Sequence, residues 1–167
     1  MAGHPVILFI TSHGPWAGPQ SAPRAWNIAR WTGENWHIRA LWSANHNYDH
    51  GSLCIEGQVW RLFAPIEAGP QSGGTGGAMA LQISHDEGRT WKGQTFPNDT
   101  ARNQTYARKP LGAHPDFSAF WADGDAFEPS NSNLYFANRD GEVFRLPAQM
   151  SGAMAFPEKF TPKNTSN

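Results

Sequence analysis

The sequence predicts an all-β protein made of short strands, on three observations. The chain of 167 residues contains 17 glycines and 13 prolines, enough for many turns, together with 8 tryptophans and few charged residues (16%). Short apolar or alternating segments, bounded by turn residues, recur along the chain without any long amphipathic helical pattern. The strongest local signal is the segment SHDEGRTW at residues 84–91. This combination is typical of all-β architectures with many tight turns.

The segment at residues 84–91 reads S-x-D-x-G-x-T-W and predicts a tight β-turn after a half-buried strand. Asp86 caps backbone N–H groups, and Gly88 takes a backbone angle that other residues resist. The hydroxyls on either side tie the two arms of the turn together, and the tryptophan folds back as an apolar anchor. The motif residues are Ser84, Asp86, Gly88, Thr90 and Trp91, and we expect their role to be structural.

Groups of strands and turns recur three times at a spacing of about 50 residues, which is the spacing of four-stranded propeller blades. The expected strands are, in order, 5–11, 25–31, 36–39, 52–55, 59–64, a pair within 78–96, then 106–109, 117–122, 134–137 and 143–146. The first is a continuous apolar run and is expected to be buried on both faces. The glycine-rich segment at 68–77 reads as a loop too flexible to sit in a core.

These groups define a partial propeller at residues 1–147, with units at about 5–48, 49–97 and 98–147, followed by a tail at 148–167. Propellers close with about 4–8 blades, whereas three units consume this chain. An arc of three blades exposes apolar faces at both ends. We therefore expect either a portion of a larger propeller, which we favour, or a truncated protein that self-associates through its exposed blade edges.

Charge and apolar patterning exclude some partners. A net charge of −1 disfavours a nucleic-acid or anionic-membrane surface. No apolar stretch approaches the length of a membrane span, and the first ten residues lack the pattern of a signal peptide. The single cysteine, Cys54, rules out an internal disulfide and is expected to be a small core residue.

The motif at 84–91 resembles the Asp-box, or BNR repeat, of sialidase-like β-propellers. Four further segments stand in an order that resembles one group of BNR-repeat proteins: PRAWNIARW (23–31), NHNYDHGS (45–52), NQTYARKP (103–110), and AHPDF (113–117) followed by WADG (121–124). That group includes polysaccharide lyases with seven-bladed propellers, such as ulvan lyases and rhamnose–glucuronate lyases. The likeness runs from about residue 6 to 147 and corresponds to the C-terminal part of those proteins.

The resemblance implies a carbohydrate-active protein that acts on a polysaccharide or oligosaccharide, secreted or periplasmic in its full-length form. It implies no required cofactor or catalytic metal, and leaves a structural calcium ion open. A uronate lyase must neutralise the carboxylate, remove the C5 proton and protonate the departing O4. Within the family-like motifs we assign His46 as base, Tyr106 or Tyr48 as acid, and Arg108 as the carboxylate partner. His114 orients the substrate or replaces His46, and the substrate-binding residues are Asn45, Arg24 and Trp121.

Each catalytic residue also has a structural interpretation. The two histidines, His46 and His114, would cap turns in polar loops, and the two tyrosines would be core aromatics. Arg108 would form a structural ion pair with Asp116 or Asp123. A zinc site built on His46 and its neighbours is disfavoured, because the spacing H-x-x-x-H suits a helix and this segment is not helical.

Three other functions compete with the lyase. A sialidase-type glycoside hydrolase needs three arginines around its substrate carboxylate; Arg24, Arg61 and Arg108 exist, but their surroundings do not match that pattern. A non-catalytic carbohydrate-binding propeller would stack sugar rings on exposed tryptophans such as Trp16, Trp42 and Trp121. A third alternative is a fragment without independent function.

Overall fold

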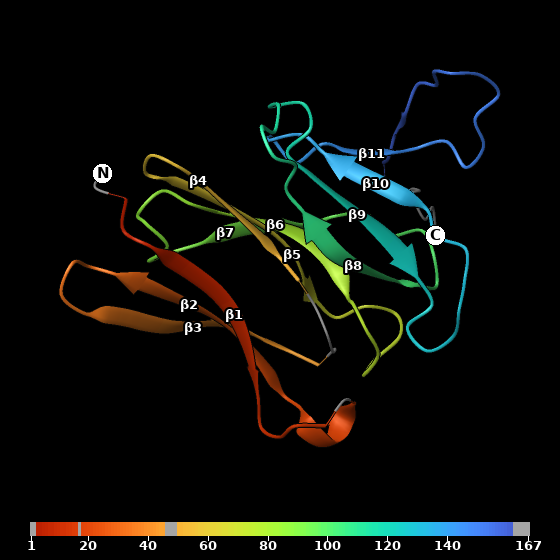
Figure 1. Ribbon diagram of the computed structural model, residues 1–167. Coiled ribbons are helices and arrows are strands. Elements are labelled where there is room, and N and C mark those ends of the chain that lie inside the picture. Colours follow the sequence, from red (N-terminus) through yellow and green to blue (C-terminus); the bar gives the residue numbers. More distant parts are fainter. Residues whose placement is uncertain (1–2, 17, 46–49, 162–167) are drawn as a thin grey trace, which may run out of the picture.

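The computed structural model describes residues 3–16, 18–45 and 50–161, and in them the chain forms three antiparallel sheets (Figure 1). The sheets contain three, four and five strands, and each follows the order of the sequence. The only helical element among the described residues is a three-residue turn at Pro19–Ser21. The predicted all-β class is confirmed, and the three sheets form no closed barrel within the described part of the chain.

Sheet 1 consists of β1 (Val6–Ser12), β2 (Arg24–Trp31) and β3 (Trp36–Ala44). The central strand β2 is largely buried, whereas both edge strands are open to solvent along much of their length. Ile7 of β1 is 48% exposed, so the expectation that this apolar run is buried on both faces is wrong. The reason is that β1 lies at the edge of its sheet and only one of its faces is covered.

Sheet 2 lies between the other two and consists of β4 (Ser52–Glu56), β5 (Val59–Glu67), β6 (Ala78–Ser84) and β7 (Lys92–Thr95). Successive side chains of a strand point to opposite faces of a sheet. Leu62 and Ala64 of β5 therefore pack with Trp26 of sheet 1, whereas Phe63 packs with Trp121 of sheet 3. Strand β5 is therefore buried on both of its faces, and it joins the three sheets into one body.

Sheet 3 consists of β8 (Asn103–Arg108), β9 (Ala119–Gly124), β10 (Leu134–Ala137), β11 (Val143–Arg145) and β12 (Glu158–Lys159). Strand β12 comes from the segment expected to be a tail. It pairs with β11, and the next residue, Phe160, is only 8% exposed. The Phe160 ring lies 5.4 Å from the ring of Tyr135, so this part of the segment adds both a strand and a core side chain.

The glycine-rich loop at 68–77 packs against β8, contrary to the expectation of a flexible segment. The amide nitrogen of Asn103 donates hydrogen bonds to the carbonyl oxygens of Gln71, Thr75 and Gly76 at 2.8, 3.1 and 3.0 Å. A Cβ at Gly69 would lie 2.3 Å from the Asn103 side-chain oxygen, so this approach requires glycine. The glycines thus serve close packing against a buried amide.

Candidate functional site

The turn at residues 84–91 connects β6 to β7 and is held by hydrogen bonds within its own sequence. The Asp86 carboxylate accepts hydrogen bonds from the backbone N–H of Thr90 at 2.8 Å and from its hydroxyl at 2.7 Å. The Ser84 hydroxyl donates to Asp86 at 2.8 Å and accepts from the N–H of Gly88 at 2.9 Å. The Thr90 N–H, with the two hydroxyls, holds the pKa of Asp86 far below its ordinary value. The carboxylate is therefore ionised and engaged by its own turn.

Gly88 and Trp91 seat this turn on the rest of the protein. Gly88 has a φ of 79°, and a Cβ there would lie 2.9 Å from the ring of Trp60. The indole N–H of Trp91 donates to the Gly88 carbonyl at 3.1 Å, and the ring meets Trp42 of β3 edge-on at 5.7 Å. The motif therefore closes a turn and fastens sheet 2 to sheet 1.

Tyr106 and Arg108, two residues apart on β8, lie together with His50 beside the start of β4. The guanidinium carbon of Arg108 is 5.9 Å from the centroid of the Tyr106 ring, and the His50 ring centroid is 5.4 Å from that of Tyr106. Tyr106 is 41% exposed and is not a core aromatic. We call these three residues the β8 cluster. Sequence reasoning missed His50, because nothing in the chain pattern places it against a residue 56 positions later.

Tyr106 lies in a β-bulge with an unusual backbone conformation. Its φ of 58° falls in the left-handed region, which bulky residues rarely adopt. The pairing of β8 with β9 shifts register between Thr105 and Arg108. The hydroxyl of Ser52 secures the segment, because it donates to the Ala107 carbonyl and accepts from the Lys109 N–H, both at 2.9 Å. Ala107 is fully buried while Tyr106 and Arg108 are exposed, so the bulge presents the side chains of Tyr106 and Arg108 to solvent.

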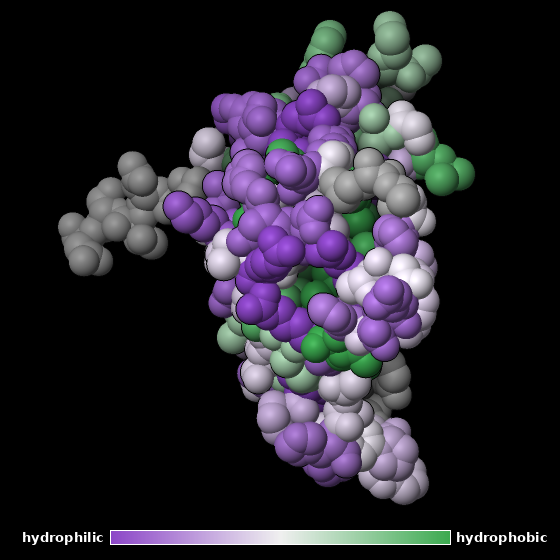
Figure 2. All heavy atoms as spheres, turned by 90° about the vertical axis from the view of Figure 1, so that its left-hand side faces the viewer, coloured by the Kyte–Doolittle hydropathy of each residue, from purple (hydrophilic) through white to green (hydrophobic). Residues whose placement is uncertain are grey.

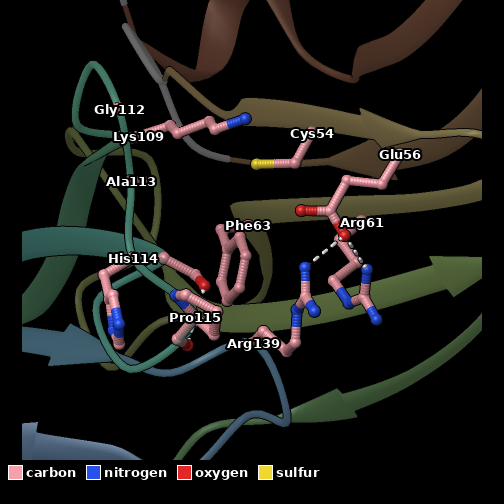
Figure 3. A pocket seen from close by; sticks show the side chains of 11 residues that line it. Cys54, Glu56, Arg61, Phe63, Lys109, Gly112, Ala113, His114, Pro115 and Arg139 are labelled. Atoms are coloured by element: carbon pink, nitrogen blue, oxygen red, sulfur yellow. Dashed lines mark hydrogen bonds and ion pairs between the residues drawn. The ribbon is translucent and has the colours of Figure 1, made fainter.

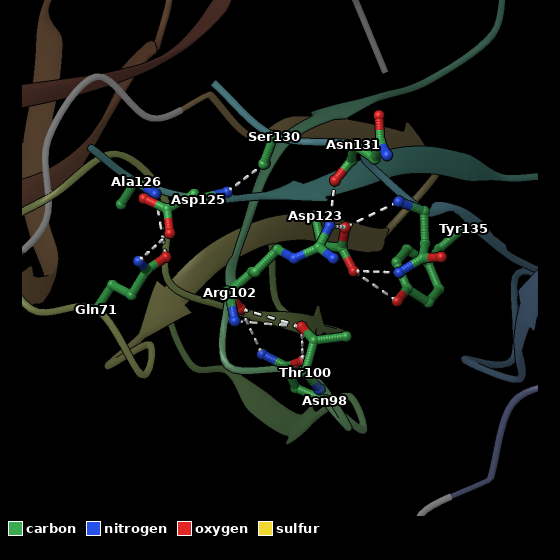
Figure 4. Close-up of polar contacts among 11 residues, drawn as sticks. Gln71, Asn98, Thr100, Arg102, Asp123, Asp125, Ala126, Ser130, Asn131 and Tyr135 are labelled. Atoms are coloured by element: carbon green, nitrogen blue, oxygen red, sulfur yellow. Dashed lines mark hydrogen bonds and ion pairs between the residues drawn. The ribbon is translucent and has the colours of Figure 1, made fainter. Parts of the chain in front are cut away.

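The partners proposed for Arg108 as a structural residue are engaged elsewhere. The Asp123 carboxylate is surrounded by donors: the Asn133 side-chain amide at 2.7 Å, the Tyr135 hydroxyl at 2.9 Å and Arg102 at 3.5 Å. Figure 4 shows Tyr135 and Arg102 beside Asp123. An oxygen of the Asp116 carboxylate lies 3.4 Å from Nδ1 of His114. Within the described residues, Arg108 therefore has neither of these carboxylates as an ion-pair partner.

Of the remaining residues assigned to catalysis and substrate binding, His114 and Asn45 make their hydrogen bonds outside the β8 cluster. His46 and Tyr48 lie outside the described residues. Nδ1 of His114 accepts a hydrogen bond from the Asp116 N–H at 3.2 Å, which is a turn-capping contact. Asn45 is exposed, and its side-chain amide donates to the Ser72 hydroxyl at 3.2 Å.

Two of the residues assigned to substrate binding are buried, and their assignment is corrected here. Arg24 is 5% exposed, and its guanidinium donates to the carbonyl oxygens of Trp16 and Gly18, so it braces the loop between β1 and β2. Trp121 is 1% exposed and stacks between Phe96 at 5.4 Å and Tyr135 at 5.9 Å. Neither presents a surface to a sugar, because β9 turns Trp121 inward toward sheet 2.

Several large hydrophobic side chains are exposed on the molecular surface, among them Trp16, Leu111 and Phe156. Figure 2 shows a largely hydrophilic face, with hydrophobic side chains visible in a hollow near its centre. Of the three tryptophans considered for sugar stacking, Trp16 has the most open ring, at 69% exposure. In the described part of the chain, no group of three or more His, Cys, Asp or Glu side chains is placed to hold a metal ion. No helix there is long and apolar enough to cross a membrane.

Comparison with known proteins adds no assignment: no family model, no curated protein and no solved structure matches this chain.

Proposed function

We propose that this chain is part of a secreted, carbohydrate-active β-propeller protein of the BNR-repeat type, and that it cleaves uronate-containing polysaccharides by β-elimination. The observation that carries the proposal is the β8 cluster: Tyr106, strained and exposed, with Arg108 and His50 around its ring. Strained residues gather at sites where the geometry serves chemistry. The three antiparallel sheets, one in each expected unit, support the propeller part of the proposal.

The chemistry of β-elimination matches the residue types of the cluster. Arg108 would pair with the uronate carboxylate and stabilise the negative charge that develops when the C5 proton leaves. An imidazole would take that proton: His46, as the sequence predicts, or His50, which lies against Tyr106. Tyr106 would donate its phenolic proton to O4 as the C4–O4 bond breaks and the C4–C5 double bond forms.

The proposal is tested by incubating the chain with a panel of uronate polysaccharides and following ultraviolet absorbance together with new reducing ends. A lyase leaves an unsaturated uronate that absorbs, so both signals rise together. New reducing ends without absorbance would contradict the lyase and favour the sialidase-type hydrolase. Binding without either signal would favour the non-catalytic propeller.

A matched pair of variants connects the activity to the cluster. Arg108→Gln removes the charge beside Tyr106, and we expect at least about a hundredfold loss in kcat/KM, the magnitude for losing one charge-stabilising group. Arg89→Gln makes the same change on the exposed turn at 84–91 and is expected to retain wild-type activity. Equal rates for the two variants would contradict the role of Arg108.

A further inference from the structure

A pocket of about 230 Å³ lies between sheets 2 and 3, separate from the β8 cluster. It is lined by β4 and β5 on one side, and on the other by the segment after β8 and the turn between β10 and β11 (Figure 3). Ligand sites for drug-sized molecules measure about 300–1,000 Å³. This volume therefore suits a small chemical group rather than a length of sugar chain.

The lining of the pocket carries an excess of positive charge. Arg61, Arg139 and Lys109 face a single carboxylate, that of Glu56. Figure 3 shows the Glu56 carboxylate beside the two guanidinium groups, while Lys109 extends toward Cys54. His114 is also part of the lining. Three permanent cations against one anion leave charge for a ligand to neutralise.

Glu56 does not use up the hydrogen-bonding capacity of the two arginines. Arg61 and Arg139 both donate to the same oxygen, Oε2, at 2.9 and 2.7 Å. The Nε atoms of both arginines are buried and have no hydrogen-bond partner among the described residues. A guanidinium carries five N–H donors, so the single contact that each arginine makes with Glu56 leaves terminal N–H groups of both for an acceptor that the protein itself does not provide.

Cys54, which also lines the pocket, does not supply the missing negative charge. Burial raises the pKa of its thiol above the ordinary value, so the sulfur is protonated at neutral pH. By contrast, the hydrogen bond from Arg139 lowers the pKa of Glu56, which remains a carboxylate. The excess positive charge of the lining is thus retained at neutral pH.

We propose that this pocket is a binding site for a tetrahedral oxyanion, a sulfate or phosphate group, held by Arg61, Arg139 and Lys109. Guanidinium groups bind such anions through paired N–H donors, and an ammonium group adds a point charge. The group could be a free anion or an ester on a larger molecule. The inference rests on the pocket alone, so it stands or falls independently of the proposed lyase activity.

The test is isothermal titration of the full chain with sodium sulfate and with sodium phosphate, at an ionic strength held constant with sodium chloride. We expect saturable binding of one anion per chain. Arg139→Gln and Lys109→Gln should each raise the dissociation constant at least about tenfold, since each removes a charge-assisted contact. Arg89→Gln makes the same charge change away from the pocket and should bind like the wild type.

The variants also separate binding from folding. Within the described part of the chain Lys109 forms no ion pair, whereas Arg139 pairs with Glu56, so Lys109→Gln should keep the wild-type circular dichroism spectrum even if Arg139→Gln does not. Titration with a sulfated monosaccharide, beside its unsulfated form, distinguishes the two sources: binding of the ester identifies a group on a larger ligand, and binding of inorganic anions alone identifies a free ion. No saturable binding, or equal affinity in wild type and Lys109→Gln, would overturn the proposal.

Discussion

Two residues other than glycine adopt left-handed backbone angles in the described structure, Glu87 with a φ of 59° and Tyr106 with a φ of 58°. Glu87 lies inside the turn at 84–91, where the hydrogen bonds of Ser84 and Asp86 account for the shape of the chain. Tyr106 lies within a strand, at a bulge, with an exposed ring beside His50 and Arg108. The same angle thus serves the architecture at one position and, in our proposal, the chemistry at the other.

The largest effect that separates the two positions is on activity. Tyr106→Phe removes only the hydroxyl, and we expect kcat to fall by about a hundredfold or more, the usual contribution of a general acid. Circular dichroism should be unchanged, because the Tyr106 hydroxyl has no hydrogen-bond partner among the residues that the structure describes. Initial rates of absorbance increase on a uronate polysaccharide measure the effect, and a rate within threefold of wild type would remove Tyr106 from the mechanism.

The next effect tests the turn. Gly88→Ala places a Cβ 2.9 Å from the Trp60 ring at a φ of 79°. The left-handed angle and the overpacking together are expected to lower the free energy of unfolding by about 2–4 kcal/mol. Urea denaturation measures this loss. Gly57→Ala is the matched control, because Gly57 also has a positive φ but no atom lies within 4 Å of its added Cβ.

A smaller effect is expected in acid. The contacts of Asp86 depress its pKa, so they contribute stability above the ordinary pKa of 3.8. That contribution is lost progressively as the pH falls below this value toward the lowered pKa of the folded state. Asp86→Asn should therefore reduce the urea midpoint at pH 7 and narrow the gap to wild type below pH 3. A gap that stayed constant from pH 7 to pH 2.5 would contradict the role of the ionised carboxylate.

The smallest expected effect is on stability when either strained residue becomes glycine. Glycine relieves the strain of the left-handed angle, which stabilises the folded protein. It also raises the entropy of the unfolded chain, which acts in the opposite direction. We therefore expect Glu87→Gly and Tyr106→Gly each to change the free energy of unfolding by less than about 1 kcal/mol. Urea denaturation of both variants is the measurement, and a loss above about 2 kcal/mol at Tyr106 would mean that its ring is structural.

The distance along the sequence between contacting residues explains how much of the fold and of the candidate site could be predicted. The partners of Asp86 lie within four residues of it, so the pattern at 84–91 contains the whole turn. The strands and the all-β class follow from equally local patterns of apolar and turn residues. The β8 cluster instead depends on His50 meeting Tyr106 across two sheets, which no local pattern specifies.

Burial was the least predictable property for the same reason. Trp121 and Phe120 are neighbours in an apolar strand, yet the first is 1% and the second 42% exposed, because sheet 2 covers only one face of β9. Arg24 reads as a surface cation, but the loop between β1 and β2 folds over it. The conformation of the glycine-rich loop likewise depends on Asn103, whose side-chain amide donates hydrogen bonds to residues about 30 positions earlier in the sequence.

The central claim is that the backbone strain at Tyr106 serves catalysis and the strain at Glu87 serves only the turn. The most direct test compares the rate of absorbance increase for Tyr106→Gly and Glu87→Gly on the polysaccharide that the wild type cleaves. We predict two folded proteins, with the wild-type rate in Glu87→Gly and no rate above background in Tyr106→Gly. Equal rates in the two variants would contradict the claim.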